Sequence, residues 1–182
     1  MPYTDEEILN LIRRADTQQR GFRLLIQTYQ ERLYWHIRRM VTQHEDANDV
    51  VQNCLIKVYR SIDKFKGDSK LYTWLYRIAT NEAITFLNKK KRVSVASIDD
   101  EQAATPAQQL QADVYFDGNE AQRQLQLAIQ QLPKKQRAVF NLRYFDEMTY
   151  ADIAAITGTS VGGLKASYHH AVKKVEAFIL NG

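Results

Sequence analysis

Few residues of this 182-residue chain have types and spacings that would support catalysis. Paired carboxylates, a nucleophile beside a base, and a glycine-rich phosphate loop do not occur in the sequence at mechanistic spacing. The adjacent His169 and His170 would point about 100° apart on a helix, with no cysteine or acidic ligand at a suitable spacing. We therefore expect no enzyme activity, no metal site and no cofactor, and we interpret both histidines as polar surface or DNA contacts.

The chemistry that the sequence favours instead is the binding of a polyanion. The formal net charge is +4, and it is unevenly distributed. Basic residues dominate positions 64–92, where only Asp68 and Glu82 oppose them, and positions 93–120 hold acidic residues without lysine or arginine. The chain is basic again after Pro133. Two basic blocks around an acidic spacer suggest two contacts with nucleic acid, although solvated charged faces would give a similar pattern.

The first basic block is interleaved with aromatic residues. Gly67 and the pair Asp68-Ser69 form a basic loop before a helix N-terminus, which suits phosphate. On the following helix, Trp74 would face the core, while Tyr72 and Tyr76 would face outward. Rings that stack on bases, beside cations that hold the backbone, favour single-stranded nucleic acid. The candidate contacts are Lys66, Ser69, Lys70, Tyr72, Arg77, Asn81, Asn88, Lys89, Lys90, Lys91 and Arg92.

The second basic block has the pattern of a helix-turn-helix. Thr149 followed by Asp152 predicts a capped helix start, Gly158 predicts a left-handed turn, and Ser160 predicts the cap of a second helix. Small and polar residues on the outer face of that second helix suit a DNA major groove. An ordinary helical hairpin is the alternative. The candidate DNA contacts are Thr149, Ser160, Gly163, Lys165, Ala166, His169, His170 and Lys173.

A third face lies on the helix predicted over 46–63. Its apolar side includes the single cysteine, Cys54, which we interpret as a small buried residue in a reducing compartment. The opposite side carries an isoleucine within a polar stripe, which can mark a docking site, although single exposed apolar residues are common. The candidate docking residues are Asp49, Gln52, Asn53 and Ile56.

Spacings of three and four between apolar residues predict an all-α chain. We expect helices near 5–16, 20–42, 46–63, 70–91, 119–131, 135–145, 149–157 and 160–180. The organisation predicted from them is a helical domain over 1–92, a flexible acidic linker over 93–119 with a short helix near 107–114, and a helix-turn-helix domain over 120–182. The acidic start and the lack of a ~20-residue apolar stretch favour a cytoplasmic protein without membrane insertion.

Together these pieces resemble the extracytoplasmic-function sigma factors of bacteria. The resemblance covers nearly the whole chain outside the linker and is carried by the order and spacing of short motifs. These are Asp46-Ala47-Asn48-Asp49-Val50-Val51-Gln52, Phe65-Lys66-Gly67-Asp68-Ser69, Thr73-Trp74-Leu75-Tyr76-Arg77-Ile78-Ala79 with Asn81, Leu132-Pro133 with Gln136-Arg137, and Thr149-Tyr150-Ala151-Asp152-Ile153-Ala154 followed by Val161-Gly162.

The resemblance implies a non-enzymatic subunit that carries core RNA polymerase to promoters and helps to open them. The face with Asp49 and Ile56 would contact the β′ coiled coil, and the loop and helix over 65–92 would read and melt the −10 element, with a flipped base near Asn81. The helix-turn-helix would read the −35 element near the β flap. The linker would run toward the active cleft and the RNA exit path, and an anti-sigma factor would hold the protein inactive.

The sequence departs from the family before its recognition helix, where Gly162-Gly163 replaces the usual Gly-Thr. Lys165, Ala166 and His170 stand where arginine or serine is common. The promoter sequence therefore does not carry over. The alternative function is a stand-alone helix-turn-helix regulator, which would leave the docking face and the helix over 70–91 without a role.

Overall fold

The computed structural model describes residues 3–96, 105, 108, 110 and 118–181, which contain helices and no strand. This confirms the predicted all-α fold. The helices are α1 (Asp5–Arg13), α2 (Gln18–Val41), α3 (His44–Ser61), the short 3-10 helix η1 (Ile62–Lys64), α4 (Leu71–Ala96), α6 (Glu120–Gln130), α7 (Lys134–Tyr144), α8 (Tyr150–Thr157) and α9 (Val161–Asn181). Among the described residues, no helix is both long and apolar enough to cross a membrane.

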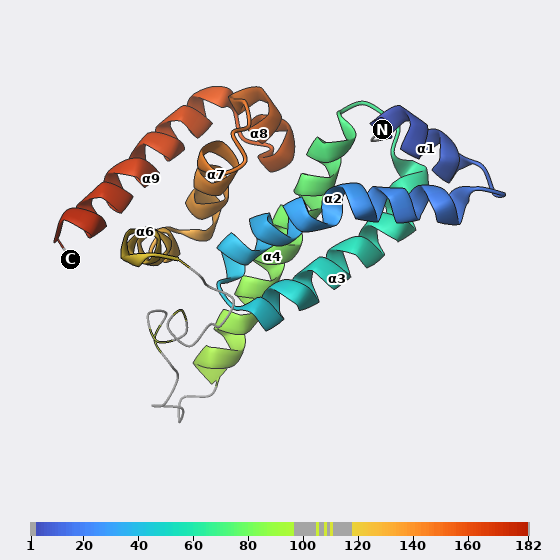
Figure 1. Cartoon of the computed structure of the whole chain (residues 1–182). Helices are drawn as coiled ribbons and strands as arrows, with labels where there is room; N and C mark the ends of the chain where they lie inside the picture. The colour runs from blue at the N-terminus through green and yellow to red at the C-terminus, as the bar shows by residue number, and fades with distance from the viewer. Residues whose placement is uncertain (1–2, 97–104, 106–107, 109, 111–117, 182) are drawn as a thin grey trace.

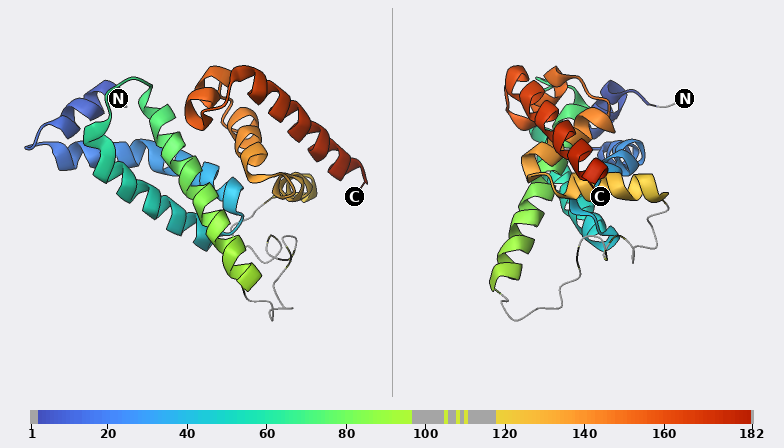
Figure 2. Two further views of the ribbon diagram at one scale, coloured as in Figure 1. Left: turned by 180° about the vertical axis from the view of Figure 1, so that it is seen from behind. Right: turned by 90° about the vertical axis from the view of Figure 1, so that its left-hand side faces the viewer.

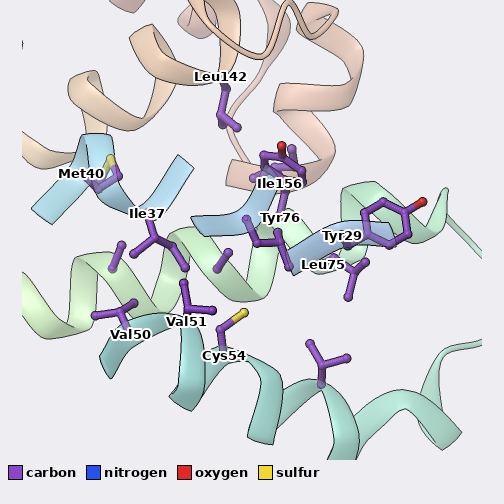
Figure 3. Close-up of a cluster of buried hydrophobic side chains, with 14 of the residues drawn as sticks. Tyr29, Ile37, Met40, Val50, Val51, Cys54, Leu75, Tyr76, Leu142 and Ile156 are labelled. Carbon is purple, nitrogen blue, oxygen red and sulfur yellow. The ribbon is translucent and has the colours of Figure 1, made fainter. Parts of the chain in front are cut away.

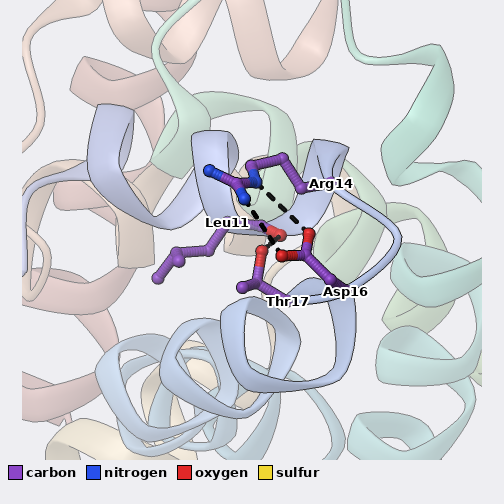
Figure 4. Close-up of polar contacts among 4 residues, drawn as sticks. All are labelled: Leu11, Arg14, Asp16 and Thr17. Carbon is purple, nitrogen blue, oxygen red and sulfur yellow. Dashed lines mark hydrogen bonds and ion pairs between the residues drawn. The ribbon is translucent and has the colours of Figure 1, made fainter.

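The tight turn between α1 and α2 folds the first helix back onto the second. Arg14 and Asp16 form an ion pair of 3.0 Å there, and the Thr17 hydroxyl donates to the carbonyl of Leu11 at 2.8 Å (Figure 4). Gly21 makes the close approach possible, because a Cβ at this position would stand 2.7 Å from the backbone nitrogen of Ile12. The apolar side of α1 is thereby buried against α2.

Helices α2, α3 and α4 form the N-terminal core. The interior side of α3 contributes Val50 and Cys54, which pack toward Ile37 of α2 and Leu75 of α4 (Figure 3). Cys54 is completely buried, and this burial raises the pKa of its thiol to about 12. The prediction that Cys54 is a buried core residue is therefore confirmed.

The helix-turn-helix has the caps that the sequence predicts. Thr149 Oγ1 accepts from the Asp152 backbone N–H at 3.1 Å, and Gly158 ends α8 in the left-handed region at φ 71°. Ser160 Oγ accepts from the Gly163 N–H at 3.2 Å, which caps the start of α9. These are all contacts within a few residues, so the local sequence was sufficient to predict them.

The C-terminal helices pack directly onto the N-terminal ones, which the sequence had left open. Helix α8 lies along α4, and α7 lies against α2 (Figures 1 and 2). Leu142 of α7 and Ile156 of α8 belong to the same buried cluster as Tyr76 of α4 (Figure 3). One apolar core therefore runs through both halves of the molecule, and a smaller cluster lies between α6, α7 and α9.

Two expectations for α4 differ from the structure. The helix continues to Ala96, five residues beyond its predicted end. Tyr76, expected on the outside, is fully buried because the C-terminal domain covers that side of the helix. Most of the predicted linker lies outside the described residues, as do most positions of its short helix; Gln108 and Leu110, which are described, are helical. The domain limits stay a prediction.

Candidate nucleic-acid interface

The predicted docking residues share one exposed side of α3. Asp49, Gln52, Asn53 and Ile56 all point away from the core, and Ile56 is 44% exposed. Tyr59, one turn further along, is 52% exposed and extends this face, although the sequence analysis missed it. The signal was available, because residues three apart on a helix are neighbours.

On α4 the candidate DNA contacts lie at the junction with the C-terminal domain. The Arg77 guanidinium donates to the Ala155 carbonyl from Nε at 3.0 Å and from Nη2 at 2.6 Å. Asn88 Oδ1 accepts from Lys134 Nζ at 2.6 Å. Asn81 is exposed and lines a cavity of about 440 Å³ between α4, α7, α8 and α9. The structure therefore brings these three residues to one side of α4, as predicted.

The loop before α4 makes a related contact. Lys70 Nζ stands 3.6 Å from a carboxylate oxygen of Asp152 and 5.5 Å from the ring centre of Tyr72. Burial, reinforced by a hydrogen bond to Asp152, raises the pKa of Tyr72. Lys66 is exposed and Ser69 is partly buried. Both lysines are exposed, but Lys70 lies beside a carboxylate of α8.

The basic end of α4 divides into two groups. Lys89, Lys91 and Arg92 are exposed. Lys90 instead reaches Asp46 at the start of α3, with Nζ 2.6 Å from its carboxylate. The structure therefore gives Lys90 a structural partner that the sequence analysis did not foresee.

The outer face of α9 is open along its length. Gly163, Lys165, Ala166, His169, His170 and Lys173 are exposed, while Thr149 and Ser160 serve as helix caps. The rings of His169 and His170 have their centres 5.9 Å apart. Within the described part of the chain, no group of three His, Cys, Asp or Glu residues could hold a metal ion.

The junction also holds two polar clusters that the sequence analysis missed. In the first, the last turn of α2 is capped by the C-terminal domain: Arg137 Nη1 donates to the Met40 carbonyl at 2.7 Å, and the side-chain amides of Gln126 and Gln130 donate to the Arg39 carbonyl at 3.4 and 3.3 Å. Arg137 is buried, and this burial lowers its pKa to about 10.

The second cluster surrounds Asp146. Tyr76 donates its hydroxyl to Asp146 Oδ1 at 3.3 Å, and His36 Nδ1 lies 3.4 Å from Asp146 Oδ2. Arg39 Nη1 is 3.9 Å from the same carboxylate, while its guanidinium stacks over the Phe145 ring at 4.3 Å. Burial raises the pKa of Tyr76, and the charge of Asp146 adds to that effect. The sequence did not predict this cluster, because its residues lie far apart along the chain.

Comparison with known proteins identifies the chain's family. The family model for sigma-70 region 2 matches residues 25–93, and that for sigma-70 region 4 matches residues 122–175. The RNA polymerase sigma-H factor of Pseudomonas aeruginosa is 32% identical, over 94% of this chain and 92% of its own. The ECF RNA polymerase sigma-E factor of Escherichia coli K12 is 31% identical, over 95% and 93%. The chain belongs to the extracytoplasmic-function sigma factors.

This sigma factor is therefore a non-enzymatic transcription initiation factor that directs RNA polymerase to promoters, as the resemblance implied. Region 2 covers most of α2 together with α3 and α4, and region 4 covers α6 to α9. Because the matches extend over both halves, the stand-alone regulator is no longer needed to explain the helix-turn-helix.

Solved structures of similar fold agree with this assignment. The sigma factor RpoE of Bartonella quintana, in complex with the anti-sigma factor NepR, aligns with a TM-score of 0.69 at 25% identity over 87% of this sigma factor and 96% of that chain. CnrH in complex with the cytosolic domain of CnrY aligns with a TM-score of 0.67 at 20% identity, over 96% and 97%. The second likeness concerns the fold alone.

Proposed function

We propose that this sigma factor binds core RNA polymerase through α3, the −10 element through the loop at 65–70 and α4, and the −35 element through α9. The single observation that carries the proposal is the presence of exposed basic faces on two different domains. The two basic blocks of the sequence thus correspond to two surfaces, each suited to a different form of DNA.

The α3 face has the composition of a protein interface. Ile56 and Tyr59 supply exposed apolar surface, and Asp49, Gln52 and Asn53 supply polar groups beside it. An apolar centre with a polar rim is usual where proteins associate. We assign this face to the coiled coil of the polymerase β′ subunit.

The α4 face is suited to unpaired DNA. Lys66 and the group Lys89, Lys91 and Arg92 place exposed charge at both ends of a helix about 39 Å long, given 26 residues at 1.5 Å each. Asn81 lies between them, and its amide can donate and accept hydrogen bonds to a base edge. Cations that hold the backbone with an amide that reads a base fit the melted −10 strand.

The α9 face is suited to a duplex. Gly163 and Ala166 allow close approach, and Lys165 and His170 bring hydrogen-bond donors to that surface. Lys173, further along the helix, is placed to meet a phosphate. We assign this face to the major groove of the −35 element, with the domain lying near the β flap of the polymerase.

Run-off transcription tests the assignment. Core polymerase is incubated with genomic fragments, with and without the sigma factor, and new transcript starts are mapped. We expect starts that depend on the added chain and that share sequence at both elements. Starts that need no sequence at either element would contradict the assignment of α4 and α9.

Two further assignments follow from this role. A factor that works on core polymerase and promoter DNA acts in the cytoplasm, where both are found in bacteria.

An anti-sigma factor is the expected regulator, supported by the complex of the similar Bartonella quintana sigma factor with NepR. A pull-down with the tagged sigma factor from its own host would test this.

A further inference from the structure

The C-terminal domain engages the same α4 face that is proposed to read the −10 element. Lys70 faces Asp152, Arg77 donates to the Ala155 carbonyl, and Asn88 accepts from Lys134. Three proposed DNA contacts thus already have partners within the chain. All three side chains remain exposed, so a DNA strand would compete with region 4 for these groups and bind them best once region 4 has moved away.

The junction is held by groups whose partners lie in the other domain. The last carbonyls of a helix need partners from outside it. For Arg39 and Met40 at the end of α2, these partners are Gln126, Gln130 and Arg137 of the C-terminal domain. Opening the molecule would leave these carbonyls to water.

Asp146 is the most specific part of this junction. Within the described residues its side-chain contacts all cross to the N-terminal domain, to Tyr76, His36 and Arg39. His36 is completely buried and also meets the Thr80 hydroxyl at 2.9 Å through Nε2. Since none of the contacts described for this carboxylate holds its own domain together, its replacement should alter the junction and leave the C-terminal fold intact.

We propose that the free sigma factor rests in a closed form that masks its own −10-reading face, with Asp146 as the latch between the domains. The inference rests on the proposed function of α4 and goes beyond it. The α4 face is covered by region 4 of the same chain, so no second protein is required. Binding to DNA is weakened by the fraction of molecules that are closed. Any contact that draws region 4 away from α4, such as assembly with polymerase, would restore the reading face.

Two variants of equal charge change test the latch in the full-length chain. Asp146→Lys places a cation against Arg39, whereas the neighbouring Glu147 is exposed, so Glu147→Lys is the matched control. The closed form is detected in a chain that carries Asn88→Cys and Lys134→Cys. The measured quantity is the rate at which a short bismaleimide joins the two cysteines. The native Cys54 stays unmodified because it is buried with a raised thiol pKa. Strand binding is measured without these cysteines, by anisotropy on the labelled non-template strand of a mapped promoter.

We expect Asp146→Lys to slow cross-linking and tighten strand binding by about tenfold, the effect of losing one hydrogen bond to a charged group. Glu147→Lys should behave as wild type in both assays. If Asp146→Lys loses helical circular dichroism, Asp146→Asn takes its place, with changes in the same direction.

Cross-linking as fast in the Asp146 variant as in the control would overturn the latch. Slower cross-linking without tighter strand binding would show that the closed form does not cover the face proposed to read the −10 element. Transcription by an Asn81→Ala chain then tells whether the assignment of α4 has failed as well, since that measurement depends on the reading face and not on the latch.

Discussion

Asn81 on α4 is exposed and lines the cavity. Among the described residues, its side chain takes part in no helix cap and no ion pair. Asn81→Ala should therefore leave folding unchanged. We expect closed-complex formation to persist while strand opening falls, by roughly tenfold if one base-reading contact is lost. Permanganate reactivity of unpaired thymines measures opening, and equal reactivity in both proteins would count against the role of Asn81.

Arg137 is the opposite case, a buried cation that meets carbonyl oxygens of both domains. Arg137→Met keeps an unbranched side chain, shorter than that of arginine, and leaves the Met40 carbonyl without its donor. We expect the free energy of unfolding to fall by about 2 kcal/mol, the scale of an unsatisfied buried group. Urea titration gives the value, with exposed Lys135→Met as the control. A control that loses as much would mean that charge alone is responsible.

The contrast between Thr149 and Asp146 shows what could be predicted from the sequence. Thr149 finds its partner three residues away, so its role follows from a local motif. Asp146 meets Tyr76, which lies 70 residues earlier. Tyr76 was placed on the wrong side of α4 because helical periodicity describes a face, and cannot tell how many neighbours cover the helix.

At the scale of elements, two glycines provide a matched test of packing. A Cβ on Gly21 would collide with Ile12 of α1, whereas a Cβ on Gly162 of α9 meets nothing within 4 Å. Gly21→Ala should lower the free energy of unfolding by about 2 kcal/mol through overpacking. Gly162→Ala should raise it by up to about 1 kcal/mol, because alanine favours a helix. Urea titrations that show the same sign for both would refute the close α1–α2 contact.

Helix α3 offers a test that separates folding from assembly, because one side lies in the core and the other is the proposed polymerase contact. Asp49→Arg together with Gln52→Arg changes only exposed positions, so the thermal unfolding midpoint should stay within a few degrees of wild type. Binding to core polymerase should weaken at least about tenfold, since mismatched charge is costly at an interface. A pull-down with purified core measures it. The pair Glu6→Arg and Asn10→Arg, at exposed positions of α1, is the control. Normal assembly by the α3 variant would assign the contact elsewhere.

The same two-sided patterns explain why helix positions were predicted well from the sequence. Each of the eight expected helices has its counterpart among the described residues, with most ends shifted by a few positions. The largest shift is the end of α4, where the sequence turns strongly basic through Lys89 to Arg92 and only then becomes apolar at Val93. The linker was expected from Val93 onward because that stretch lacks strong helical periodicity, and the four residues Val93 to Ala96 are too few to show a period.

At the scale of the whole molecule, the shared core predicts that both halves unfold together. Trp35 and Trp74 lie in the N-terminal domain, so tryptophan fluorescence follows that part, while circular dichroism follows all helices. We expect coincident midpoints in a thermal scan, as in a two-state transition. In Asp146→Lys the two signals should separate, because the junction no longer couples the domains. Separate midpoints in the wild-type chain would show that the junction is weak.

The capping of α2 by the C-terminal domain also has a consequence for the order of synthesis. The donor on Arg137 leaves the ribosome 97 residues after the Met40 carbonyl that it serves. At about 5–20 residues per second, this delay is roughly 5 to 20 seconds. In the later part of that interval, once Ala96 has emerged, the nascent chain carries α4 with its proposed DNA face uncovered. The last carbonyls of α2 are then hydrogen-bonded to water. Each newly made molecule is therefore open first and closes only when its last helices emerge.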